Sequence, residues 1–162
     1  MKQADASTLS GLAENLEAET EALQQFLEIL QAEQEALKLG NIDKLVGLSR
    51  LKSEQGVRLS QLSVNPLLKQ RGLEASAEGI KQLIQLEDPE GKRGLTNCWE
   101  KLLELAKQAR DLNRLNGAMI NAQLKHNQQA LAILQEAAKQ TSLYGPDGHS
   151  QALGMGRKLG KY

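Results

Sequence analysis

The sequence predicts an all-α protein: an elongated antiparallel bundle of three to four helices, two of them long, with a disordered C-terminal tail. Leucines recur every seventh residue near the N-terminus, glycine and proline cluster at a few breaks, and glycine becomes frequent near the C-terminus. Regular apolar spacing between such breaks is typical of helices that pack together. We therefore expect a helical bundle domain over residues 1–139 and a flexible glycine-rich tail over 140–162.

The first long helix is expected at about 5–38. Its heptad positions hold Leu9, Leu16, Leu23, Leu30 and Leu37. Leu12 and Phe26 fill two interleaved positions, whereas Glu19 and Glu33 fill the other two. This spacing places one apolar stripe on one side of the helix, and each buried leucine stabilises by about 1.5–3 kcal/mol, so the stripe needs a partner. Glu19 and Glu33 are expected at the edge of the seam, in reach of water; facing a basic partner is the alternative.

Two shorter helices are expected in the middle of the chain. Gly40 suits the left-handed position after the first helix, and Asn41 can cap a second helix at about 42–62. A shorter third helix is expected near 74–87. The break before it is marked by Pro66 and Gly72.

The second long helix is expected at about 96–139, after a loop at 88–94 that contains proline and glycine. Its first apolar face covers 99–119. A mostly polar stretch at 121–129 separates this face from a second apolar patch at 130–138. The interruption favours a separate partner for the second patch.

The lengths of the two long helices give the same indication. At about 1.5 Å per residue they would span roughly 51 and 68 Å. If they start level, about the last eleven residues of the second long helix overhang the first. The overhanging patch would be available to a helix from another chain. The alternative is that the helices are offset and that the patch packs within its own bundle.

Composition excludes several functions. Lys plus Arg and Asp plus Glu both number 20, so the surplus of positive charge that nucleic acid binding requires is missing. One Phe, one Trp and two Tyr are too few for a base-stacking platform. No segment near the N-terminus has the apolar run of a signal peptide, and no run is long enough for membrane insertion. We expect a cytoplasmic protein, and the single Cys98 fits a reducing compartment.

The sequence predicts neither an enzyme nor a cofactor or metal site. Its histidines are His126 and His149, and no Glu-x-x-His pair, phosphate-binding loop or Gly-x-Ser-x-Gly motif occurs. His126 is expected as a solvated helix residue. Cys98 is expected as a small packing residue beside Trp99, with a nucleophile as the alternative.

The tail is expected to be disordered alone. Ordering it would cost roughly 20–40 kcal/mol at about 1–2 per residue. Burying its larger apolar side chains would return about 12 kcal/mol.

The block Leu115-Asn116-Gly117, a following amphipathic helix and then Leu143-Tyr144-Gly145-Pro146-Asp147-Gly148 resemble the C-terminal half of FlgN proteins. The turn and helix start at Lys38-Leu39-Gly40-Asn41-Ile42-Asp43-Lys44-Leu45 is also typical of that family. The resemblance covers most of the chain, but residues 64–95 carry none of it.

The resemblance implies a cytoplasmic chaperone that holds the terminal helical segment of hook-filament junction proteins. Such a chaperone prevents premature assembly and delivers its client to the export gate, with the export ATPase as a further partner. Carried over to this chain, the client face is Leu124, Leu131, Leu134 and Ala138. The export-gate docking motif is Tyr144, Gly145 and Gly148. The alternative function is a coiled-coil structural or scaffold protein that self-associates.

One of these motifs is interpreted as structural, and another has a structural alternative. Asn116 and Gly117 are interpreted as a helix packing motif, because glycine lets backbones approach and asparagine can bond across. Tyr144 can instead end the helix and fold back on the bundle.

Overall fold

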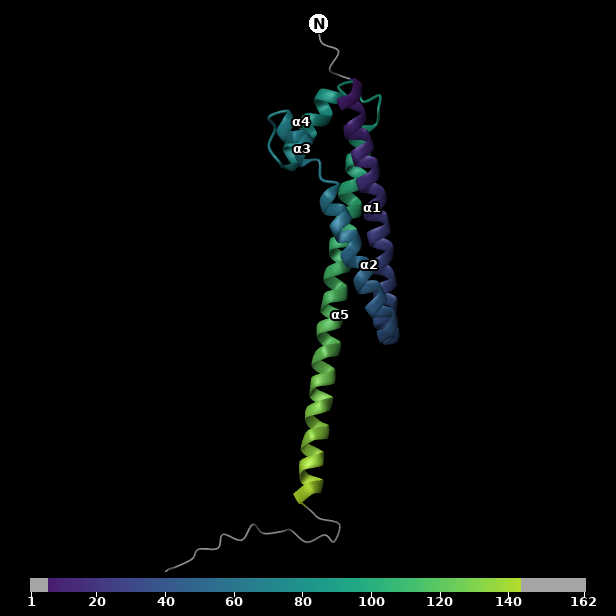
Figure 1. Ribbon diagram of the computed structural model, residues 1–162, viewed down its shortest axis with the longest axis vertical. Coiled ribbons are helices and arrows are strands. Elements are labelled where there is room, and N and C mark those ends of the chain that lie inside the picture. Colours follow the sequence, from purple (N-terminus) through teal and green to yellow (C-terminus); the bar gives the residue numbers. More distant parts are fainter. Residues whose placement is uncertain (1–5, 144–162) are drawn as a thin grey trace, which may run out of the picture. The chain divides into compact units, whose positions relative to one another are not determined.

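The computed structural model describes residues 6–143, which form five α-helices and no strand (Figure 1). The helices are α1 (Ala6–Leu39), α2 (Ile42–Gln61), α3 (Asn65–Gln70), α4 (Ala77–Glu87) and α5 (Leu95–Leu143). The predicted all-α class with two long helices is confirmed. The chain divides into two compact units, Met1–Met119 and Ile120–Tyr162, so the last part of α5 belongs to the second unit.

Most predicted helix boundaries lie close to the observed ones, with two differences. The expected break at 66–72 contains a short additional helix, α3, and Pro66 lies in its first turn. Proline is tolerated there because the first backbone N–H groups of a helix have no intrahelical acceptor. In addition, α5 extends to Leu143, four residues beyond the expected end at 139.

Within the first unit, α1 and α2 pack as an antiparallel pair (Figure 1). Gly40 joins them in the left-handed conformation at φ +64°, as expected for a residue after a helix. Asn41 then caps α2, because its side chain accepts a hydrogen bond from the Lys44 N–H at 3.0 Å. The first half of α5 runs in the same direction as α1 and opposite to α2.

The core of the first unit is formed where the apolar stripe of α1 meets the start of α5 and the short helices. The buried cluster includes Leu12, Leu16, Leu23 and Leu30 from α1, and Leu95, Trp99, Leu102 and Ala109 from α5. The middle of the chain adds Val64, Leu68, Ile80, Leu83 and Ile84. This core accounts for the leucine repeat that the sequence shows.

The N-terminus of α4 depends on one glycine. A Cβ atom added at Gly79 would overlap the carbonyl oxygen of Glu74, which is backbone and cannot rotate away. Gly79 also donates its N–H to the capping Ser76 hydroxyl at 3.1 Å. We expect Gly79→Ala to lower the free energy of unfolding by about 2 kcal/mol, the range typical of steric strain in a buried position.

Gly56 in α2 provides the matched control. A Cβ at Gly56 meets nothing within 4 Å. Because alanine favours helix interiors over glycine by about 1 kcal/mol, Gly56→Ala should stabilise the protein. Thermal unfolding of both variants, followed by circular dichroism, measures the difference. Equal and stabilising effects of the two substitutions would contradict the close contact at Gly79.

Candidate functional site

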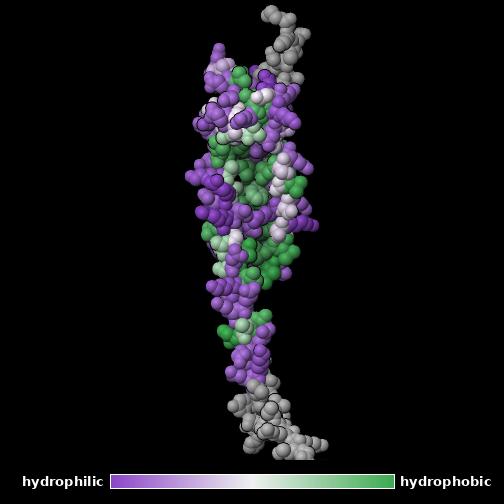
Figure 2. All heavy atoms as spheres, turned by 90° about the vertical axis from the view of Figure 1, so that its left-hand side faces the viewer, coloured by the Kyte–Doolittle hydropathy of each residue, from purple (hydrophilic) through white to green (hydrophobic). Residues whose placement is uncertain are grey.

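The predicted client face lies on the part of α5 that belongs to the second unit. Leu124, Leu131 and Leu134 are 52%, 56% and 66% exposed, and Ala138 is also exposed. Figure 2 shows apolar side chains on this part of α5, with hydrophilic stretches before and after them. Large apolar side chains in water cost free energy that contact with another chain would recover. The face is therefore a candidate binding surface.

Ile133 is an apolar residue of the same segment that sequence reasoning did not assign to the site. It is 69% exposed, more than any of the three leucines. Ile133 could have been identified from the spacing of the residues on the buried face of α5 in the first unit. That face follows a three-then-four pattern through Ala109, Leu112, Asn116 and Met119. Continued along the helix, the same pattern reaches Ile133.

Three helices meet at a buried polar cluster formed by Glu33, Lys52 and Asn116. Glu33 of α1 is 6% exposed and accepts hydrogen bonds from Lys52 Nζ of α2 at 3.0 and 3.1 Å. Asn116 of α5 is fully buried and donates from Nδ2 to Glu33 Oε2 and to the Leu30 carbonyl, both at 2.8 Å. A buried carboxylate needs such partners, because the loss of water is otherwise not compensated.

This cluster corrects two expectations. Glu33 does not lie at the edge of the seam; it is buried, and its basic partner is Lys52 of the same chain. Gly117 does not serve a close approach of helix backbones, because a Cβ at this position would meet nothing within 4 Å. Within the predicted packing motif, the contact between helices is made by Asn116.

Glu19 lies on the apolar side of α1 with its carboxyl group partly buried. Its Oε2 atom is covered and has no hydrogen-bond partner. Burial raises the pKa of Glu19, because desolvation penalises the charged form. Since the pKa is higher in the folded than in the unfolded state, the carboxyl group destabilises the fold once both states are ionised. Stability should consequently fall as the pH rises from about the ordinary glutamate pKa through the raised one.

We expect Glu19→Gln to raise the free energy of unfolding at pH 7 by about 1 kcal/mol, the scale of a poorly satisfied buried group. The gain should shrink towards pH 4, where the wild-type carboxyl group is protonated. Glu21→Gln is the matched control, because Glu21 lies two residues away on the exposed side. Urea unfolding of the three proteins at both pH values measures the effect. A gain of equal size at both pH values would exclude the titration of Glu19 as its cause.

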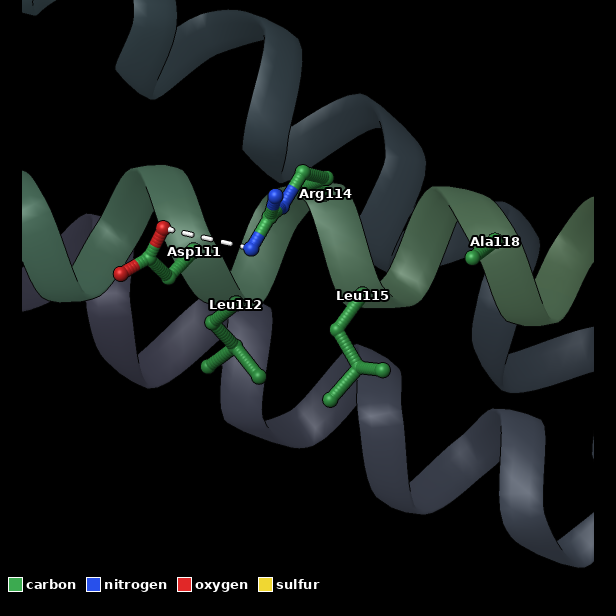
Figure 3. Close-up of a pocket in the computed structure, with 5 residues that line it drawn as sticks. All are labelled: Asp111, Leu112, Arg114, Leu115 and Ala118. Atoms are coloured by element: carbon green, nitrogen blue, oxygen red, sulfur yellow. Dashed lines mark ion pairs between the residues drawn. The ribbon is translucent and has the colours of Figure 1, made fainter.

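One stretch of α5 lines a depression of about 630 Å³, and Figure 3 shows the residues that line it. Leu112 and Leu115 extend from the same side of the helix, whereas Asp111 and Arg114 pair with each other at 3.8 Å. The lining also includes Ala118 but no histidine, cysteine or second carboxylate. Acid–base or nucleophilic chemistry requires such groups to converge, so this depression does not qualify as a catalytic pocket.

The other candidate groups are dispersed. Cys98 is half-buried and free, and His126 is exposed on α5. Among the described residues, no group of three or more His, Cys, Asp or Glu side chains is placed to hold a metal ion. No helix within 6–143 is both long and apolar enough to cross a membrane. Tyr144, Gly145, Gly148 and His149 lie outside the described residues.

The fold and the exposed face define the class: an all-α bundle protein whose last helix presents apolar side chains. The family model described as "FlgN protein" matches residues 1–152. The chain therefore belongs to the FlgN family, which confirms the resemblance seen in its sequence.

Individual relatives match along most of their length. The flagella synthesis protein FlgN of Yersinia enterocolitica serotype O:8 / biotype 1B is 32% identical over 153 residues, which cover 92% of this chain and 96% of the relative. The protein of the same name from Salmonella typhimurium strain LT2 is 31% identical over 150 residues, covering 93% and 97%. The Escherichia coli K12 protein is 24% identical over 151 residues, with the same coverage. No solved structure matches the chain.

Proposed function

We propose that the chain is a cytoplasmic chaperone of flagellar assembly that binds the terminal helical segment of hook-filament junction proteins. Membership of the FlgN family and relatives named flagella synthesis proteins support the flagellar role. The observation that carries the binding role is the exposure of Leu124, Leu131 and Leu134 on one helix. No catalytic step is assigned to the chain.

The spacing of the apolar residues on this face favours a helical client. Leu124, Leu131, Leu134 and Ala138 follow a 7-3-4 spacing, so they share one side of α5. A partner helix with its own apolar stripe can pack along such a side, as in helix-in-groove recognition. While the chaperone covers the apolar stripe of the client, that stripe cannot pack against other subunits. The client would therefore not assemble before export.

The polar stretch at 121–129 adds specificity to this face. Its amide side chains interrupt the apolar surface between Leu124 and Leu131. A polar position within an apolar helix seam fixes register, because a partner with apolar residues at that level would leave the amides unpaired. A client segment should therefore carry polar residues opposite this stretch.

Size-exclusion chromatography of the purified chain with a purified hook-filament junction protein tests the binding role. We expect a complex that elutes ahead of both components and contains both chains. Deleting the terminal helical segment of the client should abolish the complex. Separate elution of the two full-length proteins at micromolar concentration would exclude the proposed function. Elution of the chain alone as a large self-assembly would favour the scaffold alternative.

The sequence around Tyr144 supports a separate role in delivery to the export gate. The motif follows directly after α5, which ends at Leu143, and so follows the client face in sequence. An aromatic side chain with a polar tip is a common anchor at protein interfaces. We propose Tyr144, Gly145 and Gly148 as the docking motif, with the export ATPase as a further partner.

We expect Tyr144→Ala to leave client affinity within about two-fold of wild type but to weaken export-gate binding by about ten-fold or more, as for an interface anchor. Isothermal titration calorimetry with the client and with the cytoplasmic part of the export gate measures both affinities. The conservative Tyr144→Phe variant is the control, since it keeps the ring. Loss of client binding in Tyr144→Ala would contradict the division between client face and docking motif.

A further inference from the structure

We propose that the client packs two helical segments, not one, against the last part of α5, on either side of Leu134. This inference rests on the proposed function: it concerns the same helix, α5, and the way in which the client packs against it. The observation that carries it is the exposure of Ile133 together with Leu131 and Leu134.

The exposed apolar residues extend too far around the helix for one partner. With about 100° per residue, Ile133 lies roughly 160° from Leu131 by the shorter way around the axis. Leu134 and Ala130 lie between them on that arc. A single packed helix covers a stripe roughly 100° wide, so one partner would leave either Leu131 or Ile133 in water.

The rest of the segment is mostly polar. The side of α5 opposite to this arc carries Lys125, Gln128, Gln129, Gln135, Glu136 and Lys139. Over residues 130–138 the apolar surface is therefore a bounded wide arc, whereas over 121–129 the same arc holds Gln123, His126 and Asn127. A helix buries an apolar arc of this width in a three-helix bundle, where each helix contacts two others.

The first unit provides the same arrangement within the chain. There α5 follows a regular three-then-four pattern of buried and partly buried residues that ends with Asn116 and Met119. It packs against α1, and Asn116 bonds to Glu33, which also binds Lys52 of α2. Continued beyond Met119, the pattern reaches Ala130, Ile133 and Ala137. Two client helices would thus give the last part of α5 the same kind of packing that its first part has within the first unit.

A second copy of this chain fits the arc less well. In a parallel in-register pair, His126 would face His126 of the other copy at a seam position. The positions flanking that seam are Asn127, Gln129, Leu134 and Glu136, which contain one charge. Coiled coils that select their own sequence use opposite charges at these positions, and this helix has no such pairs there. The arc therefore favours a different chain.

The client segments follow from the length of the arc. The wide apolar part of the arc runs from Ala130 to Ala138, which corresponds to about 13 Å of helix. The two client segments are accordingly amphipathic helices of at least about nine residues each.

Titration calorimetry of three single variants with a purified hook-filament junction protein tests the two-helix occupancy. Leu131→Asp and Ile133→Asp place a charge on each side of Leu134, and each should weaken binding by about ten-fold or more. Ala132→Asp is the matched control, because Ala132 is exposed on the polar side of the same turn. Its affinity should stay within about two-fold of wild type. Circular dichroism verifies that each variant retains its helix content.

The outcomes separate the two proposals. Wild-type affinity of Ile133→Asp, with a loss confined to Leu131→Asp, would overturn the second client helix but leave the proposed function standing. Absence of binding by the wild-type chain would overturn both. A dimeric free chain that Ile133→Asp dissociates would assign this side of α5 to self-association instead.

Photo-crosslinking provides a readout that does not depend on the aspartate variants. p-Benzoylphenylalanine placed at Leu131 and, separately, at Ile133 should cross-link to two different client segments, identified by mass spectrometry. Cross-links from both positions to one and the same helix turn of the client would overturn the two-helix occupancy.

Discussion

Replacing Glu33 by alanine is expected to lower the free energy of unfolding by about 3 kcal/mol, because breaking a buried ion pair from one side strands its partners. The substitution leaves Lys52 without the carboxylate that binds it at 3.0 Å and leaves the fully buried Asn116 without one of its two acceptors. Lys52 retains partial contact with water, which places the cost at the lower end of the range for buried pairs.

Glu35→Ala is the matched control for this prediction. Glu35 lies two residues further along α1 and also pairs with a lysine, Lys38, but both side chains are more than half exposed. Exposed ion pairs contribute about 0–1 kcal/mol, so the control should change stability little. Urea unfolding at pH 7 measures both variants. If Glu33→Ala cost no more than Glu35→Ala, the cluster would not hold the three helices together.

A double-mutant cycle with Glu33→Ala and Asn116→Ala isolates the contact between α1 and α5. Residues that share a hydrogen bond in a buried network show coupling energies of about 0.5–3 kcal/mol. We expect a value in this range, because Asn116 Nδ2 donates to Glu33 Oε2 at 2.8 Å. Strict additivity of the two substitutions would show that this hydrogen bond has no net effect on stability.

Replacing Leu131 and Leu134 together by aspartate is expected to weaken client binding about 100-fold or more. Each leucine contributes about 1.5–3 kcal/mol when it is buried by a partner, and each aspartate would have to lose water in the complex. Because both side chains are exposed in the free chain, the substitutions should leave its own fold intact. Titration calorimetry gives the affinity, and thermal unfolding gives the stability.

The matched control for the double variant is Ala132→Asp with Gln135→Asp. These residues are exposed on the same part of α5 and introduce the same two charges outside the apolar arc. We expect client affinity close to wild type, since rim and surface substitutions usually change little. Unfolding of the chain by Leu131→Asp and Leu134→Asp alone would instead assign these leucines to the core.

The sequence predicts the long helices well, because a local repeat determines them. The heptad leucines of α1 and the glycine turn at Gly40 depend on neighbours a few residues away, and the observed α1 begins and ends within one residue of the prediction. The short helix α3 does not follow from the local sequence, since proline suits a first helical turn as readily as a break.

Contacts between distant residues explain what the sequence does not predict. Glu33 fits an exposed seam edge when it is considered alone, and its burial depends on Lys52 and Asn116, which lie 19 and 83 residues away. In the same way, the lack of any neighbour at Gly117 depends on how the helices are spaced. Ile133 follows from the continued buried spacing, whereas the 7-3-4 pattern of the leucines covers another side of the helix.

Hydrogen exchange of the chain with and without a hook-filament junction protein tests most directly whether the last part of α5 receives the client. In the free chain, amides of residues 120–141 should exchange faster than those of α1, because they lack the buried packing that protects α1. Adding the client should slow exchange over 120–141 by about ten-fold or more and leave α3 and α4 unchanged. Slowing confined to α1 and α2, with residues 120–141 exchanging as in the free chain, would contradict the proposed binding face.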